Sequence, residues 1–376
     1  AIFSLRYRRT VRFALKDFVA YAAVSFAPAV LWYCAVFVRG GSQVIEEFVA
    51  YQIRLLTTSD AGFSGPIYYH LVVLLIGCFP ASIIALRGFR VRLDSGDASI
   101  FKQWNIILLA AVVVIFSIVN TKIVHYSSLS YFPITFLAAL AAYSICYKGL
   151  EWKRTTTWLL GAVGTLWGAL LFFIPYALIN TDVIIPLVKD EFTREVLRSP
   201  VQWGGGEFAL GIAFLAILIF SLVLFARRRM ILQGLLVLFV GTACTIFAVM
   251  PLLVPKIAEY TQGAAMEFYR ANAGKEVYIH PLGIGNYKYG HLYYADKPQQ
   301  LSAYFNKNVP DDRIGVWLLE GPIDHPALFV AKVTDADEYV SKFGLELLYK
   351  KNGLAFLRRG VPADSSQIPK APITKR

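Results

Sequence analysis

Charge and cysteine are both scarce in this sequence. Only 16% of its 376 residues are charged, whereas 57% are apolar. A soluble domain usually carries about 25% charged residues and about 45–50% apolar ones. The four cysteines include no pair with the spacing of a metal site. An ordinary soluble enzyme, a disordered chain and a disulfide-stabilised scaffold are therefore all excluded.

Long uncharged runs divide the first 255 residues. Each has roughly 18–25 residues with almost no charge, which is enough for a helix to cross a bilayer. The sequence therefore predicts a polytopic α-helical membrane protein with about seven transmembrane helices in residues 1–255. The expected spans cover residues 18–38, 67–86, 104–121, 127–147, 157–179, 208–226 and 230–254.

The net charge of +12 is concentrated in alternate loops between these spans. An excess of lysine and arginine in short loops marks the cytoplasmic side of a membrane. The pattern places the N-terminal end of this chain in the cytoplasm and the region after residue 255 on the outer side. The position of the positive charge is therefore explained by cytoplasmic loops beside membrane lipids, and no nucleic acid is expected as a partner. The basic loops are residues 1–17, 87–103, 148–156 and 227–229.

Residues 256–360 have the composition of a small extracytoplasmic α/β domain. Asn352-Gly353 lies between two apolar runs and favours a tight hairpin. Residues 361–376 combine prolines with small polar residues and are expected to be disordered. The other expected elements are helices at 256–273 and 335–343 and strands at 277–279, 315–319, 328–333, 345–349 and 354–357.

No predicted span contains an internal Asp, Glu, Lys or Arg. Ion-coupled transporters normally place ionisable side chains or broken helices at mid-membrane depth, so the sequence disfavours a transporter. It also lacks a glycine-rich phosphate loop of the usual kind. Gly204-Gly205-Gly206 follows no predicted strand and is interpreted as a flexible entry to a span.

The loop between the first two spans contains several charged residues that could bind a ligand. Residues 44–56 place apolar side chains on one stripe, which predicts a helix along the membrane surface with Arg54 near its end. A guanidinium there can hold a phosphate through two parallel hydrogen bonds. The alternative is an arginine that only reaches the interface. Glu46 and Glu47 are more simply explained as first-turn carboxylates that complement the helix dipole.

The next outer hairpin is very short and contains Lys122 and His125. Both residues are expected at the membrane surface on the same side as Arg54. Together these basic residues suit the phosphate of a lipid headgroup. The alternative is that Lys122 caps a helix end and His125 meets only interfacial water.

Two segments resemble the lipid-carrier-dependent glycosyltransferases of the type C fold. The first runs from Glu46 to Tyr69 and continues into the motif of residues 78–82. The second is similar to that family's Thr-Lys…Tyr…Pro signature, here Thr121-Lys122, Tyr126 and Tyr131-Phe132-Pro133. The outer C-terminal domain extends the resemblance over nearly the whole chain. The family includes the bacterial enzymes that transfer aminoarabinose to lipid A and the protein mannosyltransferases.

The resemblance implies transfer of a sugar from a polyprenyl phosphate to a lipid or protein acceptor, on the outer side of the bacterial inner membrane. It assigns Arg54 and Lys122 to the carrier phosphate. The residues expected to bind the lipid phosphate or the substrate are Arg54, Lys122, His125, Tyr126, Tyr69, Glu47 and Asp60.

Two departures from the family qualify these expectations. Gln52 and Phe63 stand where some relatives carry histidines, so no metal ligand is assigned, although a divalent cation stays open as a cofactor. The family's catalytic acid lies several spans further upstream. We therefore expect it upstream of Ala1, and we expect this chain alone to be inactive. Two other functions stay open, a non-catalytic membrane anchor that displays an outer binding domain and a small transporter.

Overall fold

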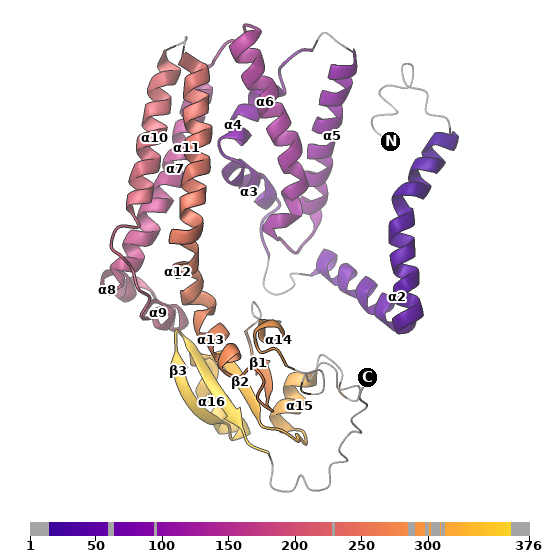
Figure 1. Ribbon diagram of the computed structural model, residues 1–376, viewed down its shortest axis with the longest axis vertical. Coiled ribbons are helices and arrows are strands. Elements are labelled where there is room, and N and C mark those ends of the chain that lie inside the picture. Colours follow the sequence, from indigo (N-terminus) through magenta and orange to yellow (C-terminus); the bar gives the residue numbers. More distant parts are fainter. Residues whose placement is uncertain are drawn as a thin grey trace. The chain divides into compact units, whose positions relative to one another are not determined.

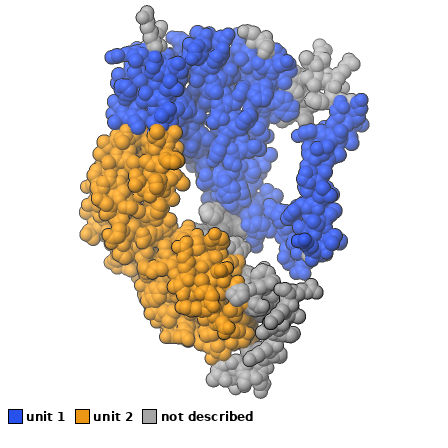
Figure 2. Space-filling model, viewed as in Figure 1, with its two compact units in different colours: residues 1–167, 215–242 blue, residues 168–214, 243–376 orange. Residues whose placement is uncertain are grey.

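Helices dominate the computed structural model, and a four-stranded sheet lies near its C-terminus (Figure 1). The chain divides into two compact units, residues 1–167 with 215–242 and residues 168–214 with 243–376 (Figure 2). The structure describes residues 15–58, 64–93, 96–227, 230–284, 290–297, 301, 309 and 313–361.

Among these described residues, six helical segments are long and apolar enough to cross a membrane. The fold is therefore that of a polytopic helical membrane protein with a small C-terminal sheet, as the sequence predicts. The six segments belong to α2 (Leu15–Thr57), α5 (Gly96–Ile118), α6 (Tyr131–Tyr147) with the 3-10 helix Val124–Ser130 before it, α7 (Arg154–Ile179), α10 (Ala209–Ala226) and α11 (Ile231–Leu252).

α2 has two arms that meet at Gly41. The φ angle of Gly41 is 73°, a left-handed conformation that glycine adopts without the steric cost of a Cβ. The first arm contains the membrane-length segment Leu15–Arg39. The second arm ends at Thr57 and contains the helix predicted at residues 44–56.

The span predicted at 67–86 is not one straight helix in the structure, which has a broken span or a re-entrant loop there. α3 (Tyr69–Gly77) and α4 (Ala81–Gly88) are separate helices, and the chain bends by 106° between them. Pro80 lies at the break. Proline has no N–H to donate, and its ring clashes with the preceding helical turn, so one continuous helix cannot form.

Side chains supply the hydrogen bonds that this break removes. Ser82 Oγ donates to the carbonyl of Leu75 at 2.7 Å, and Trp167 Nε1 donates to the carbonyl of Ile76 at 2.9 Å. Backbone groups in a lipid environment need such internal partners because no water reaches them. Two side chains that follow the break thus stabilise the carbonyl groups that precede it.

The contact of α4 with α6 depends on Gly88. α4 is almost wholly buried. A Cβ added at Gly88 would lie 2.2 Å from the carbonyl oxygen of Leu137. A small residue at this point lets the two backbones approach closely.

The second unit contains the loops and helices on either side of α10 and α11, together with the sheet. The sequence predicts one helix over residues 256–273. The structure has two α-helices there, separated by a π-helical turn at Glu259–Gly263. The short helices of this unit are α8 (Thr181–Ile184), the 3-10 helix Ile185–Leu187, α9 (Glu191–Leu197), α12 (Val254–Ala258) and α13 (Ala264–Ala271).

An ion pair between Lys256 and Glu207 joins α12 to the segment before α10. The N–H of Gly204 also donates to Glu207 Oε1 at 2.7 Å. Lys256 lies over the ring of Trp203, whose indole N–H donates to the hydroxyl of Tyr260 at 2.9 Å. The hydrogen bond from Lys256 is the main reason why the pKa of Glu207 falls to about 2.

The sheet has the strand order β1-β2-β4-β3. β1 (Tyr278–Pro281) is parallel to β2 (Ala327–Lys332), and the other pairs are antiparallel. β3 (Glu346–Lys351) and β4 (Leu354–Arg359) form the predicted hairpin. Asn352 and Gly353 both have positive φ angles there, as a tight two-residue turn requires.

Both faces of β2 are covered by helices. Ala327, Phe329 and Ala331 belong to one apolar cluster with α15 and α16, while Leu328 and Val330 belong to another with α13 and α14. Alternate side chains of a strand point to opposite faces, so the sheet is the middle of three layers. The covering helices are α14 (Gly290–Tyr294), α15 (Ile314–Glu320) and α16 (Ala336–Phe343), with the 3-10 helix Val333–Asp335 before α16.

The strand predicted at 315–319 is wrong, because these residues lie within helix α15. Ile314 and Leu318 are four residues apart and both fully buried, so they lie on one face of the helix. Aromatic and β-branched residues favour a strand only weakly, and packing overrides that preference.

We predict that Gly88→Ala destabilises the protein by about 1–3 kcal/mol, because the added methyl group forces α4 away from α6. Thermal unfolding of the purified protein in detergent would show a lower Tm. Gly77→Ala is the matched control, since a Cβ at Gly77 meets nothing within 4 Å. Equal Tm values for the two variants would contradict this account of the contact.

We also predict that acid weakens the fold partly through Glu207. Its pKa is about 2 in the folded protein and 4.5 without these interactions. The unfolded chain therefore takes up this proton first, and the stability that Glu207 contributes above about pH 4.5 is lost as the pH falls toward 2. Glu207→Gln should flatten the fall of Tm over this range. Parallel pH curves for the variant and the wild type would exclude the contribution.

Candidate functional site

The last turn of α2 is held by the hairpin of residues 120–126. The backbone N–H groups of Asn120 and Thr121 donate to carbonyls of the last turn at 3.3 and 3.4 Å. Their side chains donate to the carbonyls of Thr57 and Thr58 at 2.7 and 2.8 Å. The last four carbonyls of a helix have no partner within the helix itself. The hairpin supplies donors for this helix end and so fixes where α2 stops.

Arg54 lies in this last turn. Its side chain is exposed, and its guanidinium lies 5.1 Å from the centre of the Tyr51 ring. Its carbonyl accepts hydrogen bonds from both the N–H and the hydroxyl of Thr58. The backbone that carries Arg54 is thus fixed, while the guanidinium is presented at the surface.

Lys122 is buried, with only 4% of its surface exposed. Its ammonium group donates to the carbonyls of Ser117 and Val119 at 2.6 Å and to that of Phe116 at 3.2 Å. These three bonds use all three protons of the ammonium group. Burial lowers the pKa of Lys122 below its usual value. The structure therefore shows Lys122 capping the end of α5, and its bond to Phe116 is the longest of the three.

The segment before α3 packs against the same hairpin. Ser64 pairs with Thr121 in an isolated antiparallel bridge. A Cβ at Gly65 would lie 3.1 Å from the ring of Tyr69 and 3.2 Å from the side chain of Lys122. The absence of a side chain at Gly65 thus lets Tyr69 and Lys122 come close to the same point.

His70 is fully buried beside this group. Its ring lies 5.1 Å from that of Tyr69 and 6.1 Å from that of Phe116, between centroids. Neither ring nitrogen has a hydrogen-bond partner within the described part of the chain. A buried polar group without a partner costs about 1–3 kcal/mol. Sequence reasoning did not single out His70, and the only signal was an imidazole in the first turn of an apolar run.

Tyr126 and His125 extend the cluster along the hairpin. The ring of Tyr126 lies 5.2 Å from that of Phe116 and 5.2 Å from that of His125. Tyr126 is half-buried, whereas His125 is exposed. The structure thus connects Tyr69, His70, Phe116, Tyr126 and His125 through ring contacts.

The two acidic residues of the predicted set have other positions. Glu47 accepts a hydrogen bond from Gln43 at 2.9 Å on the exposed surface of α2. It precedes Arg54 by seven residues, a distance of about 10 Å along a helix axis. Asp60 lies outside the described residues. The side chains described around the hairpin are therefore cationic, aromatic or polar without negative charge, which suits an anion.

Among the residues that the structure describes, no group of three or more His, Cys, Asp or Glu side chains is arranged to hold a metal ion. The residues described around the hairpin also fit a metal poorly, because they include no carboxylate beside the two histidines. No metal ligand is assigned to them.

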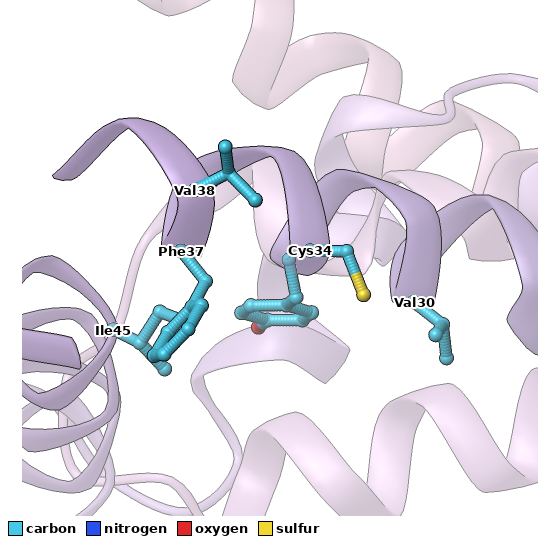
Figure 3. A pocket seen from close by; sticks show the side chains of 6 residues that line it. Val30, Cys34, Phe37, Val38 and Ile45 are labelled. Atoms are coloured by element: carbon cyan, nitrogen blue, oxygen red, sulfur yellow. The ribbon is translucent and has the colours of Figure 1, made fainter. Parts of the chain in front are cut away.

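An apolar hollow lies along α2 beside the bend at Gly41 (Figure 3). It reaches from the first arm to Ile45 in the second arm. Ile45 precedes Arg54 on the same arm by nine residues, or about 14 Å along the helix axis. The lining residues are Val30, Tyr33, Cys34, Phe37, Val38 and Ile45.

The fold is similar to that of ArnT from Cupriavidus metallidurans. The superposition on the structure bound to undecaprenyl phosphate has a TM-score of 0.54, and that on the apo structure has a TM-score of 0.58. In both cases the sequences are 16% identical, and the match covers 95% of this chain and 63% of ArnT. The present chain thus spans less than two thirds of the length of ArnT. No family model matches the sequence, and no curated protein matches it.

We predict that Lys122→Met destabilises the protein, because it leaves the last carbonyls of α5 without their donor. The cost is about 1–3 kcal/mol for each buried carbonyl left unpaired, and it would appear as a lower Tm in detergent. Lys148→Met is the matched control, since Lys148 is exposed just after α6. A Tm for Lys122→Met equal to that of the control would show that the cap contributes nothing.

Proposed function

We propose that this chain belongs to a glycosyltransferase that takes its sugar from a polyprenyl phosphate. The observation that carries the proposal is the fold, which matches ArnT over 95% of the chain. The cationic and aromatic cluster around the hairpin supports it, since one of the matching ArnT structures holds undecaprenyl phosphate. The motifs that suggest the same family from sequence lie in this cluster.

The reaction would be a displacement at the anomeric carbon of the sugar. A nucleophile of the acceptor forms the new bond while the bond to the carrier phosphate breaks. The electron pair of that bond leaves with the phosphate oxygen, so negative charge grows there. Cations placed at that oxygen lower the barrier. No carboxylate of the described cluster is assigned as the base.

Arg54 is the residue best placed to bind the phosphate directly. Its guanidinium is exposed at the end of a fixed helix, and its planar donors match two phosphate oxygens. Lys122 is proposed to contribute positive charge and to turn one N–H from the carbonyl of Phe116 to the phosphate. Tyr69, Tyr126 and His125 are proposed to line the same site.

The apolar hollow on α2 suits the isoprenoid chain of the carrier. It is lined by apolar side chains and lies on the helix that carries Arg54. A phosphate at Arg54 and an apolar chain running back toward Ile45 would match the two ends of such a lipid. Glu47 and Asp60 are retained as predicted substrate-binding residues, with no contact to the hairpin assigned to them.

The setting proposed for the reaction is the outer side of the bacterial inner membrane. The charge of the loops supports a cytoplasmic N-terminal end for this chain and a periplasmic position for the sheet. The acceptor is proposed to be a lipid or a protein. A divalent cation remains a proposal for which no ligands are assigned.

We predict that Arg54→Ala weakens binding of undecaprenyl phosphate by at least about tenfold, because the phosphate loses a bidentate charged partner. Binding would be measured on the purified chain in lipid nanodiscs. Arg54→Lys should recover only part of the affinity, since an ammonium group lacks the planar pair of donors.

Arg39→Ala is the matched control, because Arg39 is an exposed arginine of the same helix. It should bind the lipid like the wild type. If Arg54→Ala and Arg39→Ala lost the same affinity, the effect would be explained by a general loss of surface charge and not by a specific contact of Arg54. A wild-type chain that does not bind undecaprenyl phosphate would contradict the proposed function and favour a membrane anchor or a small transporter.

A further inference from the structure

The first turn of α3 has two features that fit an anion. α3 has nine residues, and the N–H groups at a helix N-terminus, with the positive end of the helix dipole, favour negative charge. Its N-cap residue Tyr68 makes no side-chain cap. The second feature is His70, a fully buried imidazole with no partner for either nitrogen among the described residues.

His70 belongs to the first turn of α3, next to the N-terminal end of the helix. Side chains in an α-helix tilt toward its N-terminus, so His70 in the first turn leans toward the N-terminal end of α3. Tyr69 precedes it, and a Cβ at Gly65 would meet the side chains of both Tyr69 and Lys122.

Phe116 contacts both His70 and Lys122, and it accepts the hydrogen bond that Lys122 can most easily give up. The ring of Phe116 packs on His70, and its carbonyl accepts the longest bond of the Lys122 ammonium, at 3.2 Å. A ligand that takes this hydrogen bond in place of the Phe116 carbonyl would enter the same cluster as His70. An anion suits that place, because the Lys122 ammonium is cationic and the side chains described around the hairpin carry no negative charge.

We propose that His70 is a further phosphate-binding residue, which donates a ring N–H to the carrier phosphate at the N-terminus of α3. The proposal rests on the proposed function for the identity of the lipid, but its chemistry requires only a phosphate group. Lys122 turns one proton from the carbonyl of Phe116 to the phosphate, and Tyr69 moves aside with it. The ring N–H of His70 then gains a partner that none of the described residues supplies.

A purely structural role for His70 and a role in binding predict different results. If the nitrogens of His70 served the fold, His70→Phe would destabilise the protein. A buried polar side chain without partners can be replaced by an apolar one of similar shape at no loss of stability. His70→Phe should therefore fold as well as the wild type or better. Only a role in binding causes the same variant to lose its ligand.

The experiment compares His70→Phe and His70→Gln with the wild type in nanodiscs. We expect His70→Phe to keep or raise the Tm and to bind undecaprenyl phosphate at least about tenfold more weakly. We expect His70→Gln to stay within about threefold of the wild type, because its amide group still donates a hydrogen bond. His291→Phe is the matched control, since it removes another buried imidazole and should bind the lipid normally.

Inorganic phosphate tests which source of phosphate the site accepts. Protection of the wild type against heat by inorganic phosphate, lost in His70→Phe, would support the proposal with free phosphate as a ligand. A loss seen only with undecaprenyl phosphate would support it with the lipid-linked phosphate as the ligand.

Three results would overturn the proposal. The first is normal lipid binding by His70→Phe while Arg54→Ala fails to bind, which leaves the proposed function intact. The second is failure of His70→Phe to fold, which would show that the nitrogens serve the fold. The third combines two observations: the wild type does not bind the lipid, and inorganic phosphate protects the wild type and His70→Phe against heat to the same extent. This result would reject both the proposed function and the role of His70.

Discussion

A helix leaves its last carbonyl oxygens without partners in the helix itself, and residues elsewhere in the first unit supply donors for them. Asn120 and Thr121 close the end of α2, and Lys122 closes the end of α5. A second buried lysine, Lys102, does the same after α4, where its ammonium donates to the carbonyls of Phe89 and Val91. These donors come from residues that hydropathy marks as exceptions in an apolar chain.

The same donors determine the chemistry of the site. A short hairpin that must satisfy two helix ends brings cationic and polar side chains to one place, beside the exposed guanidinium of Arg54. Aromatic rings then pack around the buried lysine and leave His70 without a partner among the described residues. A site with positive charge, N–H donors and little competing water favours an anion. The structural cap and the proposed phosphate site are thus two uses of one arrangement.

Much of the fold follows from patterns along the chain. The apolar runs identify the helices of membrane length, and Asn352-Gly353 identifies the hairpin of β3 and β4. Hydropathy does not record where a helix breaks, so the run at 67–86 conceals the bend at Pro80. Composition also misleads at 315–319, where burial of Ile314 and Leu318 on one face produces a helix.

For the site, the sequence by itself identifies the residue types and predicts their side of the membrane, because charged residues are few in this chain and the basic ones gather in alternate loops. It identifies Arg54 and Lys122 as the cations of interest and leaves two roles open for Lys122. Only the tertiary structure decides that the Lys122 ammonium caps α5, that Gly65 lets Tyr69 approach it and that His70 is buried without a partner among the described residues. The reason is that hydrogen bonds join residues about 60 positions apart, as between Asn120 and Thr57, and no local pattern specifies which distant carbonyl a donor will meet.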